Sequence, residues 1–220
     1  MRERSNLLIY LASASPRRSA LLTQIGVGHQ VRAVDIDERV LPGETPAHYV
    51  VRLAIAKAQA LWERLEAEGG RERAAVIGSD TSVALGDRIL GKPQDRMHGR
   101  QMLEQLSGRT HQVYTAVALR NAAGCESRLS VSDVTMRRLT PVEMDAYWLT
   151  GEPVDKAGGY AIQGVAAVFV ERIAGSYSGI VGLPLSETGD LLRMIGWPLL
   201  QEPADRTVQG TQDTPAGVVR

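Results

Sequence analysis

The sequence predicts an α/β fold in which one mixed β-sheet is flanked by helices. Short, continuous apolar runs at residues 7–12 and 74–78 are typical of strands that are buried on both faces. Amphipathic helical segments lie between the strands, and two long extended stretches follow each other in the middle of the chain. Helices and strands therefore alternate along the chain, as in a mixed sheet covered by helices. The order of the strands does not follow from these patterns.

The first strand, residues 7–12, leads directly into a helix. Ser15 is a suitable N-cap and Pro16 suits the first helical position, and Gly26 ends the helix. A second helix starts in the same way at Thr45 and Pro46, and its apolar positions recur at helical spacing up to Gly69. Both helices thus have a start and a stop signal.

The middle of the chain is predicted to be mostly extended. Residues 74–78 form a strand, and residues 81–85 and 88–90 form a hairpin around Gly86 and Asp87. A helix through Met102 to Leu106 ends at Gly108, and residues 110–119 and 129–139 then form a long hairpin.

The last part of the chain is predicted to hold two helices and one strand. Thr140 and Glu143 match a capping box, which predicts a helix to about residue 150. Residues 165–173 are predicted as a strand and residues 184–195 as an amphipathic helix. The segment 201–220 is polar and without periodicity, so we expect a folded body over residues 1–200 and a disordered tail.

Composition excludes several classes of protein. The chain of 220 residues carries 25 basic and 25 acidic residues, so the net charge is zero, and this argues against a general nucleic-acid or membrane-surface binder. The lone Cys125 excludes an internal disulfide framework and a cysteine-rich zinc site. There is no secretory pattern and no apolar run near the roughly 18 residues of a membrane span. We therefore expect a cytoplasmic protein with no nucleic-acid or membrane partner.

One phosphate-binding motif is matched only in its spacing. Residues 86–92 read G-x-x-x-x-G-K, as in a P-loop, but Pro93 follows where the P-loop needs a Ser or Thr that ligates Mg²⁺. Proline also keeps Lys92 extended and prevents the required helix. The sequence therefore favours a hairpin and an extended turn here.

Two segments carry candidate polar groups at the ends of predicted elements. Ser13, Ser15, Arg17 and Arg18 surround a helix N-terminus, which suits either an anion site or an ordinary cap with solvated arginines. Asp80 follows a buried strand, where it could hold a cation, take a proton from water, or simply form a turn.

Three further segments are weaker candidates. Glu38 belongs to an acidic run, residues 35–38, which could ligate Mg²⁺ or Mn²⁺ but is more typical of a solvated loop. Lys57 lies at the edge of an apolar helix face. Gln163, in a Gly-rich connection, offers a donor and an acceptor for a base edge. The four histidines lack metal-ligand spacing, and His111 is expected to be structural.

Taken together, these segments resemble the Maf family of nucleoside triphosphate pyrophosphatases over residues 7–195. The resemblance rests on ordered motifs: LASASPRR at 11–18, GSDT at 78–81, GKP at 91–93, LSGRTH at 106–111 and GLP at 182–184. The segments 151–164 and 175–177 are similar to the branch that acts on dTTP and UTP. Ser79 and Ser82 depart from the common pattern, but neither replaces a reacting group.

The resemblance implies a fold of two lobes around an elongated mixed sheet, with the nucleotide in a cleft between them, and a homodimer. It implies that Asp80 is the proton acceptor, that Lys57, Lys92 and Glu38 lie in the pocket, and that a divalent metal, Mg²⁺ or Mn²⁺, is held by Asp80 and Glu38. Specificity would come from Arg17, Thr81 and Gln163, with Ser13 and Ser15 at the phosphates. The expected reaction hydrolyses dTTP and UTP to the monophosphate and pyrophosphate, removing non-canonical or excess nucleotides.

Two alternative functions stay open at this point. One is hydrolysis of 7-methyl-GTP, the activity of another branch of the same family. The other is nucleotide binding without turnover, as a regulator of septum formation.

Overall fold

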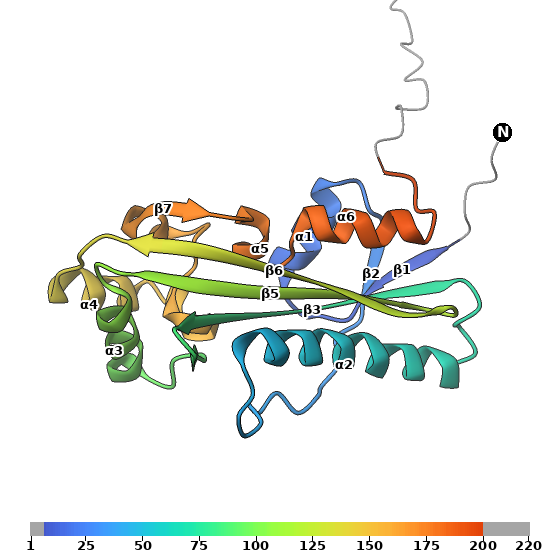
Figure 1. Ribbon diagram of the computed structural model, residues 1–220, viewed down its shortest axis with the longest axis horizontal. Helices are drawn as coiled ribbons and strands as arrows, with labels where there is room; N and C mark the ends of the chain where they lie inside the picture. Colours follow the sequence, from blue (N-terminus) through green and yellow to red (C-terminus); the bar gives the residue numbers. More distant parts are fainter. Residues whose placement is uncertain (1–6, 200–220) are drawn as a thin grey trace, which may run out of the picture.

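A computed structural model describes residues 7–199, which form a long, twisted, seven-stranded mixed sheet with helices around it (Figure 1). The strand order is β2-β1-β3-β5-β6-β7, and β4 also pairs with β3. β1 is parallel to β2 and β3, and every other pairing is antiparallel. The strands are β1 (Leu8–Leu11), β2 (His29–Val31), β3 (Ala74–Leu85), β4 (Arg88–Leu90), β5 (Thr110–Asn121), β6 (Gly124–Met136) and β7 (Val170–Ala174). The predicted mixed α/β class is confirmed.

Helices cover the sheet differently at its two ends. The described residues form α1 (Pro16–Gln24), α2 (Pro46–Ala67), α3 (Arg96–Leu106), α4 (Pro141–Leu149), α5 (Tyr177–Val181) and α6 (Leu185–Met194), with short 3₁₀ turns η1 (Glu152–Asp155), η2 (Ala157–Gly159) and η3 (Val165–Phe169). Near β1, α1 and α6 cover one face and α2 the other, whereas α3 and α4 lie at the far end (Figure 1). None of the described helices is long and apolar enough to cross a membrane.

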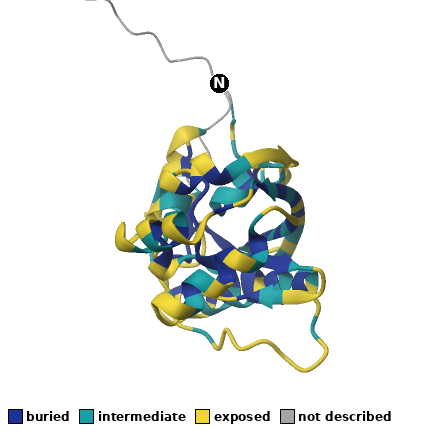
Figure 2. Ribbon diagram, turned by 90° about the vertical axis from the view of Figure 1, so that its left-hand side faces the viewer, coloured by how far each residue is buried: buried dark blue, intermediate teal, exposed yellow. Residues whose placement is uncertain are grey.

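The buried side chains form three clusters that follow this arrangement. On β3, Ile77 packs with α1 and α6, and its neighbour Val76 packs with α2, because successive residues of a strand face opposite sides. Val83, further along the same strand, belongs to the cluster under α3 and α4. Buried residues therefore line the middle of the sheet, and the outer helix faces are exposed (Figure 2).

Side-chain caps explain why the helices begin where the sequence predicts. The Thr45 hydroxyl accepts a hydrogen bond from the His48 N–H, and Thr140 and Glu143 form the predicted capping box. Ser15 takes the N-cap position of α1, but its hydroxyl makes no capping hydrogen bond. Instead the Ser13 hydroxyl accepts from the Ser15 N–H at 3.2 Å, which leaves the helix N-terminus free of a side-chain cap.

β3 is one continuous strand of 12 residues, so the expectation that a strand ends before Asp80 is wrong. The reason is β5, which pairs with β3 without a break from Val76 to Ala84. On the opposite edge, β1 pairs only up to Ile77, and β4 pairs only from Val83. Residues 78–82 therefore have no strand partner on that edge, and Asp80 lies in the middle of this gap.

Residues 165–169, predicted as the first part of a strand, instead form η3, and the strand covers only Val170–Ala174. The cause is a glutamate: Glu152 accepts hydrogen bonds from the Val165 and Ala166 N–H groups, which a strand ladder would need.

The long hairpin is confirmed, but its second strand runs over 124–136 and not 129–139. The Asn121 side chain accepts hydrogen bonds from the Ala123 and Gly124 N–H groups, so the turn is tight and the strands extend right up to it. The predicted tail, 201–220, lies outside the described residues.

Candidate functional site

A cavity of about 520 Å³ opens at the unpaired edge of β3. That volume is in the range of small-molecule sites. Every candidate residue from the sequence lines it: Ser13, Ser15, Arg17, Glu38, Lys57, Asp80, Thr81, Lys92 and Gln163. The structure thus brings together residues from six separate segments of the chain.

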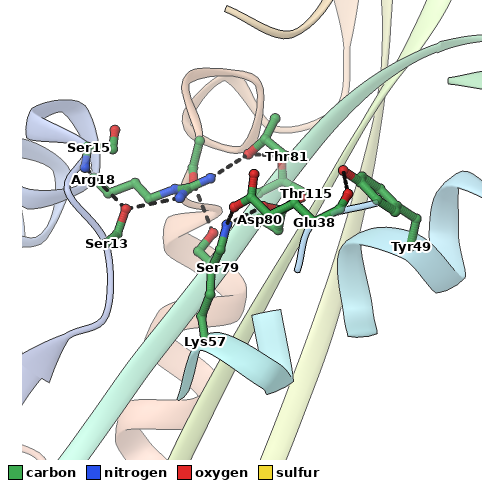
Figure 3. A network of polar contacts seen from close by, with 11 residues as sticks. Ser13, Ser15, Arg18, Glu38, Tyr49, Lys57, Ser79, Asp80, Thr81 and Thr115 are labelled. Atoms are coloured by element: carbon green, nitrogen blue, oxygen red, sulfur yellow. Dashed lines mark hydrogen bonds and ion pairs between the residues drawn. The ribbon is translucent and has the colours of Figure 1, made fainter. Parts of the chain in front are cut away.

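Arg18 joins two of these segments to the loop that carries Gly182 (Figure 3). Its Nη1 donates to the Ser13 hydroxyl at 3.0 Å and its Nη2 to the Thr81 hydroxyl at 3.3 Å. Its Nε donates to the Gly182 carbonyl at 2.8 Å. Burial lowers the pKa of Arg18, although the charge of Asp80 opposes this effect. Arg18 therefore fixes the N-terminus of α1 against β3, a role that the sequence did not distinguish from that of Arg17.

A lysine that lines the cavity lies between two carboxylates (Figure 3). The Lys57 Nζ is 2.7 Å from Asp80 Oδ1 and 2.6 Å from Glu38 Oε1. The side chains of Lys57 and Asp80 are each only 10% exposed, so most of their charge is removed from water. A buried charge without a partner is strongly unfavourable, so the ammonium and the carboxylate stay in contact and both side chains are fixed in position.

The two carboxylates differ in their environment. Burial raises the pKa of Asp80, and this effect outweighs the charges of Lys57 and Arg18. For Glu38, burial also acts to raise the pKa, but the hydrogen bond and charge of Lys57, with Lys92 and Arg18, lower it overall. Asp80 is therefore the stronger base of the two, and Lys57 supplies the positive charge that favours its ionised form.

Glu38 belongs to a loop that α2 holds in place. The Tyr49 hydroxyl donates to the Glu38 carbonyl at 2.9 Å, and Arg52 Nη2 donates to the Arg39 carbonyl at 3.0 Å. Asp37 pairs with Arg39 and is exposed, so of the acidic run only Glu38 faces the cavity. No role for Tyr49 follows from the sequence, where it forms part of an apolar helix face.

Another part of the cavity wall is formed by residues 155–163, which pack against the extended segment after β4. The Gly158 N–H donates to the Gly91 carbonyl at 3.0 Å, which places Lys92 beside this segment. Tyr160 and Ile162 are buried, and Gln163 is exposed and lines the cavity. Tyr160 donates or accepts a hydrogen bond with His111 Nε2 at 2.7 Å, so His111 is buried in a structural contact, as expected.

Ser82 also lines the cavity, and its hydroxyl is buried without a hydrogen-bond partner. It lies two residues after Asp80 on β3, and therefore faces the same side of the sheet. An unpaired buried hydroxyl is unfavourable by itself, because it loses its hydrogen bonds to water and gains none in the protein.

Asp80 and Glu38 are the residues that could hold a divalent metal. Both carboxylates reach the same Lys57 ammonium from different segments, so they already converge. The described residues contain no group of three or more metal-ligating side chains. Two carboxylates fit Mg²⁺ or Mn²⁺ that arrives with a phosphate ligand, because such ions keep waters and phosphate oxygens as their other ligands.

A family model and the curated relatives agree with each other. A family model described as "Maf-like protein" matches residues 8–195. A dTTP/UTP pyrophosphatase of Pseudoalteromonas atlantica is 51% identical over 84% of this chain and 95% of its own. Another, from Alkalilimnicola ehrlichii, is 52% identical over 84% of this chain and 91% of its own. The solved structure of the Staphylococcus aureus Ham1 protein matches 58% of this chain and 71% of its own, with 14% identity and a TM-score of 0.39, which does not establish a shared fold.

Proposed function

The chain belongs to the Maf family, and from this premise we propose that it is a pyrophosphatase that hydrolyses dTTP and UTP to the nucleoside monophosphate and pyrophosphate. The observation that carries the proposal is the buried Lys57–Asp80 pair in a cavity lined by further cations. Relatives about half identical over most of the chain have this activity in their names.

Asp80 acts as the proton acceptor in this reaction. A water molecule attacks the α-phosphorus, the bond from that phosphorus to the bridging oxygen breaks, and pyrophosphate leaves with the bond electrons. The water proton passes to an Asp80 carboxylate oxygen, whose basicity is increased by burial. Lys57 holds this carboxylate in place and ready to accept the proton.

The cations of the cavity offset the charge of the triphosphate. Arg17 lies at the uncapped N-terminus of α1 beside Ser13 and Ser15, and free N–H groups at a helix start favour phosphate. Lys92 also lines the cavity. Phosphoryl transfer depends mainly on such positioning and charge stabilisation, so no covalent intermediate is needed.

A divalent metal, Mg²⁺ or Mn²⁺, belongs to this proposal. Asp80 and Glu38 would hold it, and when bound it would neutralise phosphate charge. The residues of the chain keep their own tasks: Asp80 accepts the proton, and Lys57 keeps the two carboxylates in place.

Gln163 and Thr81 read the base in the proposed complex, with Arg17 as the third specificity residue. Gln163 offers an amide donor and an acceptor to the cavity. The Thr81 hydroxyl is held by Arg18 and by Thr115, whose hydroxyl lies 3.1 Å away. A fixed hydroxyl and an amide suit the edge of a pyrimidine better than a larger purine in the same space.

We also propose a homodimer of two-lobed chains, as the family resemblance implies, with removal of excess or non-canonical nucleotides as the cellular task. Light scattering coupled to size-exclusion chromatography measures the dimer directly. A mass of one chain at micromolar concentration would contradict it.

Pyrophosphate release tests the function. The full-length protein is incubated with dTTP, UTP, CTP, ATP, GTP and 7-methyl-GTP, each with Mg²⁺ and with Mn²⁺. We expect dTTP and UTP to be cleaved fastest. A preference for 7-methyl-GTP would move the chain to another branch, and tight binding of UTP without any turnover would favour the non-catalytic regulator.

A further inference from the structure

A glutamate outside the cavity holds the segment that carries Gln163. Glu152 Oε2 accepts a hydrogen bond from the Val165 N–H at 2.9 Å, and Oε1 accepts one from the Ala166 N–H at 3.2 Å. The Tyr147 hydroxyl donates to Oε1 at 2.6 Å. Glu152 does not line the cavity, so it has no direct part in the binding of a ligand.

Tyr147 extends this contact to the other side of Gln163. Its hydroxyl oxygen accepts a hydrogen bond from the Ala161 N–H at 3.1 Å while its proton goes to Glu152. The N–H groups of Val165 and Ala166 bond to the Glu152 carboxylate directly, and the N–H group of Ala161 is connected to it through Tyr147. Removal of that carboxylate would leave the Val165 and Ala166 N–H groups and the Tyr147 hydroxyl to find new acceptors.

The position of Glu152 depends on a glycine at position 164. A Cβ on Gly164, the residue next to Gln163, would lie 2.1 Å from Glu152 Oε2, so only glycine fits while the glutamate stays in place. The Tyr147 side chain is fixed in turn, because its ring packs edge-on against Phe169 with the centroids 5.2 Å apart. The glycine and the carboxylate thus fit each other.

The carboxylate stays charged in this position. Burial acts to raise the pKa of Glu152, but the hydrogen bonds from Tyr147, Val165 and Ala166 lower it overall. Hydrogen bonds to a charged acceptor are stronger and shorter than neutral ones, so the anion holds the segment more firmly than an amide would.

We propose that Glu152 is a positioning residue that sets substrate specificity: through Tyr147 and three backbone N–H groups it fixes segment 161–166 and thereby the Gln163 amide at the base end of the cavity. This proposal rests on the proposed function, because it takes the cavity to bind a pyrimidine nucleotide. It predicts that loss of Glu152 weakens recognition of the base and leaves the phosphate end intact.

The test separates the two ends of the substrate. In Glu152→Gln one oxygen acceptor becomes a donor that faces backbone N–H groups, so we expect KM for UTP to rise about tenfold while kcat changes less than about threefold. Inhibition by UMP should weaken by about the same factor, because UMP carries the base. Inhibition by pyrophosphate should not change, because pyrophosphate has no base.

Two further variants and one control complete the experiment. Tyr147→Phe removes only the bridging hydroxyl, and Gly164→Ala displaces the carboxylate without removal of it; both should repeat the pattern. Glu68→Gln is the control, because Glu68 is likewise paired, with Arg32 at 2.7 Å, but lies at the C-terminal end of α2. It should leave all three constants unchanged. Tyr147→Phe keeps the test usable if Glu152→Gln does not fold.

The outcomes distinguish this inference from the proposed function. Equal weakening of UMP and pyrophosphate, or a loss of kcat alone, would overturn the positioning role while the enzyme stays a pyrophosphatase. If the wild type releases no pyrophosphate, the proposed function fails, and calorimetric titration of UMP and pyrophosphate against the same variants still decides whether Glu152 acts on the base end.

Discussion

Asp80 is the residue on which the proposed chemistry depends most. It is buried, its pKa is raised, and its carboxylate meets the Lys57 ammonium at 2.7 Å. Asparagine has the same shape but cannot accept the proton of water. We expect Asp80→Asn to lower kcat by about 10²-fold to 10⁴-fold, the usual contribution of a general base.

The assay is pyrophosphate release from UTP, and the control is Asp87→Asn. Asp87 is exposed in the turn between β3 and β4, so its replacement should leave kcat unchanged. Turnover within tenfold of wild type in Asp80→Asn would remove Asp80 from the role of proton acceptor.

Ser82 offers a different test, on stability. Its hydroxyl is buried without a partner, so it contributes the cost of desolvation and no hydrogen bond. We expect Ser82→Ala to raise the free energy of unfolding of the free protein by up to about 1 kcal/mol. Urea unfolding monitored by circular dichroism measures the change, and a clear loss of stability would mean that the hydroxyl does have a partner.

Sequence reasoning grouped the residues that line the cavity, but it did not predict the contacts between them. All candidate side chains do line one cavity, and they could be proposed from the sequence because they belong to motifs that occur in order along the chain. Arg18 was missed as a separate element of the site, since its bond to the Gly182 carbonyl joins positions 164 residues apart. No local pattern records a contact over that distance.

At the scale of elements, β3 and α2 make a close backbone contact at Gly78. A Cβ on Gly78 would lie 2.2 Å from the Ala54 carbonyl oxygen and 2.7 Å from the Ala58 nitrogen. Both atoms are helix backbone and cannot rotate away. We expect Gly78→Ala to move α2 and to lower the free energy of unfolding by about 3 kcal/mol, in the upper range for an overpacked core.

Gly28→Ala is the matched control for this prediction. A Cβ on Gly28 meets no atom within 4 Å, and its backbone is not in the left-handed region. Its thermal midpoint should therefore stay within about 2 °C of wild type, since a change of 1 kcal/mol moves the midpoint by about 2–4 °C in a chain of this size. Equal midpoints for both variants would show that β3 and α2 separate without cost.

Elements were predictable where local chemistry decides them. Thr45, Thr140 and the prolines that follow them set two helix starts through their own hydrogen bonds and fixed backbone angles. The continuity of β3 through Asp80 was not predictable, because the pairing with β5 overrides the turn preference of the segment. For the same reason η3 replaced a strand: the donors of Val165 and Ala166 are taken by Glu152.

At the scale of the whole molecule, stability depends on pH through one buried histidine. His111 is completely buried, and burial lowers its pKa to about 4 from 6.5, with Asp133 opposing this effect. Around it, Tyr160 contributes a hydroxyl, whose own pKa is raised by burial so that it stays neutral. Nδ1 of His111 has no partner, so a second proton would find no acceptor.

The direction of the effect follows from these two pKa values. Above pH 6.5 both the folded and the unfolded states hold His111 neutral, and stability is complete. Between pH 6.5 and about 4 the unfolded state binds a proton that the folded state refuses, so stability falls as the pH falls, by about 3 kcal/mol in total. Carboxylates whose pKa is lowered to about 2, such as Glu44 and Glu143, also stabilise the folded state. Their contribution to stability is lost only when the pH falls below about 4.5.

Urea unfolding of wild type and of His111→Gln between pH 7.5 and 5 measures this contribution. We expect the free energy of unfolding to decline over this range in the wild type and to be nearly flat in the variant, whatever its absolute stability. Parallel curves would assign the decline to other groups.

The strand order and the position of the cleft could not be derived from patterns in the sequence. They depend on which strand edge remains unpaired, and residues 78–82 become free only because β1 and β4 each stop short of them. That geometry belongs to the assembled sheet and to no single segment of it.

The same strands that form the floor of the cleft also connect the hydrophobic clusters at its two ends. β3 and β5 run through both, with an unbroken ladder from Val76 to Ala84 between them. Hinged enzymes close about a few loop residues that absorb large changes in backbone angle. Here any closure around a nucleotide has to be taken up as added twist along the paired strands. The resistance of the sheet to twisting therefore limits how closely the cations that line the cleft can approach one another.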